Sequence, residues 1–311
     1  MLQRNSRKAV LVADGAMFVI AMFWGSGFGV TGWLLGRVSP LWLIAMRFVL
    51  STAILAPVLW RRLHLLSRKD LMLGCGLGAL CAITFIAHVM GLMFTSAGKQ
   101  SFIAGSNVVM VPLLFALFYR KMPSLVATLG AVLTTAGLLV MAFTPGMTFN
   151  VGDFISLFLA LGIALHVLFT GNLSRRMDPS ALALVMMASS AVLLLAFAVI
   201  FEPLPDLASF SLKVWGGIAY VAVFVTVIPF LVQIIAQRYS PEVHAAIILS
   251  LESPSGYFIA VFMGQEMLNA QVVMGGFIIL AGVILAEIDT FVRSRFPALS
   301  TESGNADREN A

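Results

Sequence analysis

Residues 181–201 read ALALVMMASSAVLLLAFAVIF, an apolar run that contains no charged residue. A helix formed by this run would be apolar on every face, whereas a strand of a membrane barrel alternates apolar and polar side chains. A membrane-spanning helix needs about 20 predominantly apolar residues, and only helices and closed barrels satisfy their backbone hydrogen bonds in lipid. The run therefore predicts a transmembrane helix.

The rest of the chain has the same character. Its 311 residues are 60% hydrophobic and 11% charged, against roughly 25% charged residues in a typical soluble domain. Mean hydropathy is +1.00. The composition predicts an all-α polytopic membrane protein with ten transmembrane helices joined by short loops. The expected spans are residues 10–36, 41–60, 71–93, 98–118, 124–143, 151–172, 181–201, 212–235, 241–262 and 267–288.

Basic residues gather in alternate loops. Fifteen lie on the side of the N-terminus, three (Arg37, Lys99 and Lys213) lie on the other side, and Arg47 lies inside a span. Because cytoplasmic loops carry the excess of Lys and Arg, both termini are expected in the cytoplasm, with the first span acting as a signal anchor. This bias explains the basic isoelectric point without a nucleic-acid partner.

The remaining motifs argue against catalysis. The chain contains no HExxH, GxSxG or P-loop sequence, and Cys75 and Cys81 are six residues apart, so they point to different faces of a helix. We therefore expect no enzyme activity, cofactor, metal site or disulfide, although a dispersed active site stays open.

The chain also repeats itself. Shifts of 139, 142 and 145 residues superpose similar residues in order, for example Asp14 on Asp153, Pro112 on Pro254 and Gly130 on Gly275. The series predicts two five-helix units, residues 1–147 and 148–290, before a disordered cytoplasmic tail, 291–311. Since five is odd, the second unit would enter the membrane in the opposite sense, and such inverted repeats are typical of alternating-access transporters with a site near the midplane.

Glu252 is the one acid placed near the middle of a span, and Ser253 and Pro254 follow it. An ionisable residue in hydrocarbon is expensive and normally faces a cavity or a partner, which indicates a functional site. A structural hydrogen bond between helices is the alternative. Pro254 removes a backbone donor, so we expect a freed carbonyl close to the acid.

Other spans bring polar groups to the depth of Glu252. At about 1.5 Å of rise per residue, Trp24, Asn107 and His166 also fall near mid-depth. We expect these four residues to line a substrate site, where His166 and Glu252 could carry protons. Three hydroxyl residues at similar depth are expected to bond carbonyls of their own helices: Thr84, Ser106 and Thr226.

Several further polar residues favour structural roles. Arg47 could bind an anionic group of a substrate, but we favour a structural or snorkelling role. Asp14 and Asp153 are expected to cap the first turns of related helices. His88 and His244 are expected near the membrane interfaces. A glycine stripe on the first span predicts close approach of another helix: Gly25, Gly29, Gly32 and Gly36.

Two stretches resemble EamA-type transporters of the drug/metabolite transporter superfamily. Residues 23–51, FWGSGFGVTGWLLGRVSPLWLIAMRFVLS, resemble the opening WGSNF…SP…RF pattern of that family. Residues 250–285, SLESPSGYFIAVFMGQEMLNAQVVMGGFIILAGVIL, resemble its closing pattern. The chain departs from the family at FYRKMPS (residues 118–124), where many relatives have Gly-Glu, and at Ile163-Ala164, where they have Trp-Gly.

The resemblance implies ten helices around a central cavity, with the fifth and tenth spans at the periphery. It implies export of amino acids, drugs or other small metabolites across the bacterial inner membrane without ATP. The positions that match recurrent family residues are Trp24, Arg47, Glu252 and Glu266. Arg47, Glu252 and Glu266 are candidates for coupling or gating, with a structural role as the alternative for Glu266.

The sequence therefore predicts a secondary or facilitative transporter for small metabolites. The expected partners are a small-molecule substrate and the lipid bilayer, with a homodimer as an open alternative. A non-transporting membrane component, such as a lipid-binding or assembly factor, is the competing interpretation.

Overall fold

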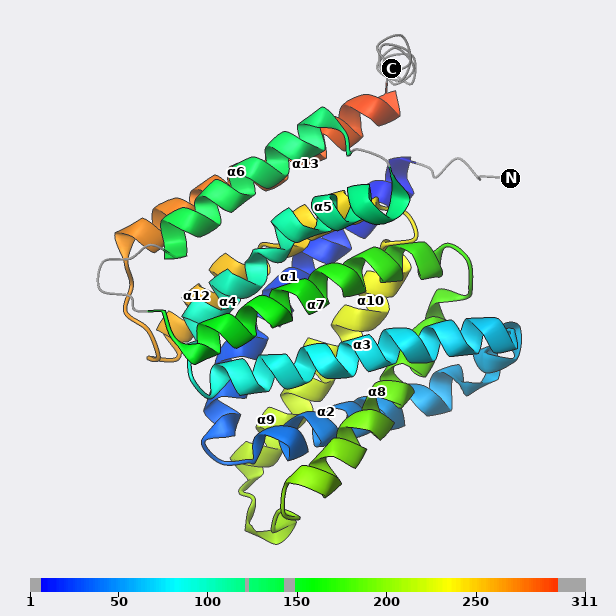
Figure 1. The fold of residues 1–311 in the computed structure, drawn as a ribbon, viewed down its shortest axis with the longest axis vertical. Coiled ribbons are helices and arrows are strands. Elements are labelled where there is room, and N and C mark those ends of the chain that lie inside the picture. Colours follow the sequence, from blue (N-terminus) through cyan, green and yellow to red (C-terminus); the bar gives the residue numbers. More distant parts are fainter. Residues whose placement is uncertain (1–6, 121–122, 143–148, 296–311) are drawn as a thin grey trace.

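A computed structural model describes residues 7–120, 123–142 and 149–295 of the chain, and these residues form helices joined by short loops (Figure 1). In the first half the helices are α1 (Arg7–Leu35), α2 (Pro40–Leu59), η1 (Trp60–Leu65), α3 (Arg68–Leu92), α4 (Ala97–Gly105), α5 (Asn107–Tyr119) and α6 (Leu125–Ala142). In the second half they are α7 (Val151–Ser174), α8 (Pro179–Phe201), η2 (Leu207–Ser209), α9 (Leu212–Ala222), η3 (Val223–Val227), α10 (Ile228–Ala236), α11 (Glu242–Leu249), α12 (Glu252–Phe262) and α13 (Ala270–Arg295).

The helices confirm the expected fold class. Eight helical segments are long and apolar enough to cross a membrane, and the two remaining apolar helices, Leu125–Met141 and Ala270–Leu285, are shorter. The number of ten spans therefore stays a prediction. Helix α13 continues to Arg295, and residues 296–311 of the expected tail lie outside the described residues.

Three of the expected spans are interrupted. The fourth breaks at Ser106 between α4 and α5, and the ninth breaks at residues 250–251 between α11 and α12. At each break a serine hydroxyl bonds a carbonyl three residues earlier: Ser106 to Ile103 at 2.7 Å and Ser250 to Ile247 at 2.6 Å. These local bonds compete with the regular helix ladder. The eighth span contains the π-helical turn η3 between α9 and α10.

Pro254 affects the ninth span differently from the expectation. Its missing N–H would have donated to the carbonyl of Ser250 in a regular helix. The N–H of Ser253 donates to that carbonyl instead, at 3.1 Å. The carbonyl that Pro254 would free, that of Ser250, is therefore not left open.

The last three corresponding helices of the two halves begin at a constant separation. The starts of α4 and α11, Ala97 and Glu242, are 145 residues apart, as are those of α5 and α12, Asn107 and Glu252. The same separation of 145 joins the starts of α6 and α13, Leu125 and Ala270.

Helices α6 and α13 pack against each other along one edge of the molecule, the peripheral place expected for the fifth and tenth spans (Figure 1). Their glycines meet crosswise. A Cβ on Gly137 would lie 2.7 Å from the carbonyl oxygen of Gly275, and one on Gly282 would lie 2.8 Å from that of Gly130. Because the earlier residue of each helix meets the later residue of the other, the pair is antiparallel.

The glycine stripe of α1 makes close contacts with another helix over part of its length. A Cβ on Gly25 would lie 2.6 Å from the Cβ of Ser255 in α12, and one on Gly29 would lie 2.9 Å from the sulfur of Met263. Gly32 and Gly36 have no such tight contact, and Gly36 is exposed. The expected close approach is therefore confirmed at Gly25 and Gly29, where α1 meets α12.

Candidate substrate cavity

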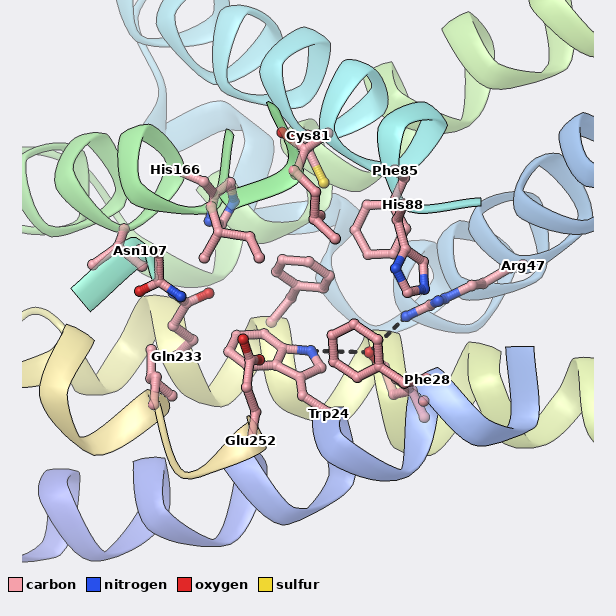
Figure 2. A pocket seen from close by; sticks show the side chains of 18 residues that line it. Trp24, Phe28, Arg47, Cys81, Phe85, His88, Asn107, His166, Gln233 and Glu252 are labelled. Atoms are coloured by element: carbon pink, nitrogen blue, oxygen red, sulfur yellow. Dashed lines mark hydrogen bonds between the residues drawn. The ribbon is translucent and has the colours of Figure 1, made fainter. Parts of the chain in front are cut away.

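A cavity of about 80 Å³ lies between the two halves of the chain. Figure 2 shows Arg47 and His88 at one end, Asn107 and Gln233 at the other, and Trp24 between them. The lining side chains come from α1, α2, α3, α5, α7, η3, α10, α11 and α12. They are Trp24, Gly27, Phe28, Arg47, Cys81, Thr84, Phe85, His88, Asn107, Leu159, Ile163, His166, Val167, Val225, Phe230, Gln233, Leu249 and Glu252.

The structure brings together the four residues expected to form a site, because Trp24, Asn107, His166 and Glu252 all line this cavity. Glu252 is the first residue of α12 and is 5% exposed. Its Oε1 atom has no hydrogen-bond partner among the described residues. A buried carboxyl oxygen without a partner is destabilising, so Glu252 is a candidate for binding a ligand in this cavity.

Asn107 holds the matching position in the first half. It is the first residue of α5, directly after the break at Ser106, and it is 1% exposed. Its Nδ2 donates to the carbonyl of Ala104 at 2.8 Å, while its Oδ1 has no partner among the described residues. Each half thus places one polar side chain with an unsatisfied oxygen at the same point of a broken helix.

The π-helical turn η3 presents a carbonyl oxygen to the cavity wall. Pro229 has no N–H to donate to the carbonyl of Val225 four residues earlier. Two other donors reach this oxygen, Trp24 Nε1 at 3.1 Å and Arg47 Nη2 at 2.9 Å, and Figure 2 marks both bonds. Single-turn π-helices of this kind often occur at functional sites.

Arg47 therefore has structural partners. Besides Val225 it donates from Nε to Thr226 Oγ1, and Thr226 Oγ1 donates to the carbonyl of Val221 at 2.8 Å. The guanidinium also lies over the Phe85 ring, 4.6 Å from its centre. These contacts fit the structural role favoured for Arg47, and binding of an anionic group stays a prediction.

Two histidines, His166 and His88, line the cavity, but only His166 was expected there. His166 lines the cavity as expected, with its ring edge-on to Phe230 at 5.4 Å and its Nε2 atom 3.2 Å from Met186 Sδ. The interfacial position expected for His88 is wrong, because His88 is 6% exposed and lines the cavity beside Phe28 and Phe85. Depth along one helix cannot reveal that neighbouring aromatic rings enclose a side chain.

Of the two helix caps expected from the sequence, one is present and the other is not. Asp153 forms a capping box with Asn150 at the start of α7, as expected, and also contacts Lys99. The cap expected at Asp14 is wrong because α1 begins at Arg7, so Asp14 lies about two turns inside the helix. Asp14 instead contacts His244 of α11, and this histidine is 3% exposed, so its position near a membrane interface stays a prediction.

Glu266 lies outside the cavity. It follows α12, and its Oε1 would be 3.0 Å from a Cβ on Gly98 at the start of α4. Coupling or gating by Glu266 stays a prediction.

Sequence reasoning missed Phe230, Gln233 and the Val225 carbonyl that accepts from Trp24 and Arg47. The available signal was Pro229, which interrupts an otherwise apolar span. Cys81 also lines the cavity, and both cysteines of the chain are free thiols.

A bundle of apolar helices enclosing a partly polar cavity is typical of a polytopic membrane protein. The EamA-like transporter family matches residues 11–143 and 150–287, so the chain belongs to the EamA-like transporter family. It is therefore a multi-pass membrane transporter, which confirms the family resemblance of its sequence.

One sequence relative and one solved structure extend this comparison. An uncharacterized transporter of Archaeoglobus fulgidus is 27% identical over 280 residues, covering 89% of this chain and 86% of the relative. One solved crystal structure superposes with a TM-score of 0.73 at 14% sequence identity, covering 91% of this chain and 98% of that chain. At this identity the solved structure speaks for the fold alone.

Proposed function

We propose that the chain is a secondary or facilitative transporter that exports small metabolites across the bacterial inner membrane by alternating access. Amino acids or related compounds are the substrate class, with drugs as further candidates. Both termini would lie in the cytoplasm, because 15 basic residues are on their side of the expected spans and three are on the other.

One observation carries the proposal: Glu252 and Asn107 line the same buried cavity, and each has an oxygen without a partner among the described residues. A ligand that carries an ammonium group would complement the Glu252 carboxyl. The Oδ1 atom of Asn107 would accept a hydrogen bond from a second polar group of the ligand. Trp24 and Phe230, whose ring centres are 5.4 Å apart, would receive the apolar part of the ligand.

Alternating access is supported by the relation between the two halves. The separation of 145 residues between the starts of the last three corresponding helices and the crossed glycine contacts of α6 and α13 are what inverted repeats at residues 1–147 and 148–290 would produce. Binding in transporters of this architecture occurs near the midplane between the repeats.

The non-transporting alternative receives less support. A lipid-binding or assembly factor without a transport site would fill the space between its halves with side chains. The cavity between the halves of this chain, with its unpaired carboxyl oxygen, favours transport of a ligand instead.

Counterflow in proteoliposomes tests the proposal. Purified protein would be reconstituted with an excess of one unlabelled amino acid or metabolite inside, and uptake of the labelled compound would be followed across a panel. We expect transient accumulation of at least one ammonium-bearing compound, and Glu252→Gln should abolish it. Asp206→Asn is the matched control, because Asp206 is an exposed acid in a loop far along the chain from the cavity residues.

Absence of counterflow for the whole panel would overturn the transport proposal. Proton coupling through Glu252 and His166 has a separate readout. If Glu252→Gln retains transport with the pH dependence of the unaltered protein, Glu252 carries no coupled proton.

A further inference from the structure

Two buried acid–base contacts join the halves of the chain. Lys99 Nζ in α4 lies 2.5 Å from Asp153 Oδ2 in α7, and His244 Nε2 in α11 lies 3.4 Å from Asp14 Oδ2 in α1. Each contact links the first helix of one half to the broken helix of the other half. The four residues will be called the two cross-repeat pairs.

The cross-repeat pairs occupy equivalent positions. Asp14 and Asp153 are 139 residues apart, the shift that superposes the first helices of the two halves. Lys99 is the third residue of α4, and His244 is the third residue of α11. One arrangement of acid and base therefore occurs twice, with the partners exchanged between the halves.

The two pairs lie toward opposite ends of the bundle. Helices α1 and α7 run in opposite directions, so Asp14 and Asp153, both near the starts of their helices, are on opposite sides of the molecule (Figure 1). On α1 the cavity begins at Trp24, ten residues after Asp14, and on α7 it begins at Leu159, six residues after Asp153. Ten helical residues span about 15 Å and six span about 9 Å, so one pair lies beyond each end of the cavity.

Burial makes these contacts hard to break without water. The side chain of Asp153 is fully buried and that of Asp14 is 3% exposed. Separating Lys99 from Asp153 leaves uncompensated charge in a medium of low dielectric, and separating His244 from Asp14 does so when the histidine is protonated. Hydration of the separated groups removes that penalty. Each pair should therefore separate only when its end of the bundle opens to water.

The same short helices lead from the pairs to the cavity. Helix α4 has nine residues and α11 has eight, and each is followed within three residues by the polar cavity residue of its half, Asn107 or Glu252. A half-helix that moves away from its acid partner at one end thus displaces the binding group at the other end. The distance from Lys99 to Asn107 along the helix is about 12 Å.

We infer that Lys99–Asp153 and His244–Asp14 are the two gate contacts of the transporter, one holding each end of the central cavity closed. This inference rests on the proposed alternating access. It assigns Lys99, Asp153, Asp14 and His244 as positioning residues for the conformational change, since none of them lines the cavity.

Native Cys81 provides the test, because it lines the cavity and Cys75 is the one other cysteine in the sequence. In a Cys75→Ser background, a membrane-impermeant thiol reagent would be applied separately to each face of oriented membrane vesicles. Lys99→Ala should increase the Cys81 labelling rate from the face of the Lys99–Asp153 pair alone, and Asp14→Asn should do so from the other face alone. A coupling of typical size corresponds to an increase of about fivefold or more.

Two further variants separate gating from general damage. Exchanging the charges, Lys99→Asp with Asp153→Lys, should return labelling toward the background rate. Arg62→Ala breaks the exposed Arg62–Asp178 contact of 3.0 Å and should leave labelling from both faces unchanged. An equal increase from both faces, or no increase from either, would overturn the gate assignment.

The labelling requires no transported substrate. Face-specific labelling in a protein without counterflow would refute the proposed substrates and keep the gate contacts. Unchanged labelling in a protein that shows counterflow would refute the gate contacts and keep the proposed function.

Discussion

Asn107 and Glu252 are counterparts, each the first residue after the break in the fourth helix of its half, and both side chains line the central cavity. The repeated prolines suggest a different correspondence, because the shift that superposes Pro112 on Pro254 places Glu252 opposite Met110. The helix starts, 145 residues apart, correct this correspondence by three residues. The two halves thus supply one neutral and one ionisable group from equivalent positions.

We predict that Asn107→Leu weakens ligand binding without weakening the fold. The substitution removes the bond from Nδ2 to the Ala104 carbonyl, but it also removes an amide oxygen that is buried without a partner among the described residues. These effects oppose each other, so the midpoint of thermal unfolding should change little. Losing one ligand hydrogen bond of about 1.4 kcal/mol should weaken binding about tenfold.

Thermal unfolding with and without a substrate identified by counterflow measures both effects, because a ligand of the folded state raises its apparent stability. Ser106→Ala is the matched control, since the Ser106 hydroxyl bonds the carbonyl of Ile103 in its own helix. An Asn107→Leu protein whose substrate-induced shift equals that of the unaltered protein would exclude Asn107 from the binding site.

Much of this architecture could be predicted because it depends on distances along one helix. Long apolar runs set the spans, and a fixed rise per residue sets depth, so Trp24, Asn107, His166 and Glu252 could be placed at one level. The cavity lined by all four follows from that shared depth. Close packing at Gly25 followed from residue size alone.

The contacts between distant segments could not be predicted in this way. His88 was expected at an interface, but the aromatic rings of Phe28 and Phe85 enclose it. Asp14 and His244 are 230 residues apart in the sequence, and no local pattern indicates their contact. Which face of a helix meets which partner depends on the packing of all the helices together.

Gly25 should be intolerant of even one added carbon. A Cβ there would lie 2.7 Å from the backbone nitrogen of Gly256 and 2.8 Å from the carbonyl oxygen of Glu252, so α12 would have to move. Gly25→Ala should reduce the free energy of unfolding by about 1–3 kcal/mol through overpacking, and it should impair transport by displacing Glu252.

Gly76→Ala is the control for this substitution, because Gly76 is also inside a helix but has no atom within 4 Å of an added Cβ. There alanine should stabilise the protein by up to about 1 kcal/mol through its higher helix propensity. Denaturation of both variants in mixed micelles gives the comparison. Equal stability of the two variants would show that α1 and α12 can separate without loss.

Trp24 and Arg47 both donate to the carbonyl of Val225, so we expect their substitutions to have coupled effects on stability. Trp24→Phe keeps an aromatic ring and removes one donor, which should destabilise the protein by about 1 kcal/mol. Arg47→Met should have a larger effect, because Arg47 also donates to Thr226. With either donor left, the carbonyl still has a partner.

The double variant Trp24→Phe with Arg47→Met should therefore be less stable than the sum of the single effects predicts, by about 0.5–3 kcal/mol. It leaves the carbonyl of Val225 buried without its two observed donors, because Pro229 supplies no N–H. Adding Pro229→Ala to the double variant restores that N–H and should recover part of the lost stability. Denaturation of the four proteins of the cycle and of the Pro229→Ala triple variant measures these differences. Simple additivity within about 0.5 kcal/mol, with no recovery from Pro229→Ala, would mean that the shared carbonyl does not couple Trp24 to Arg47.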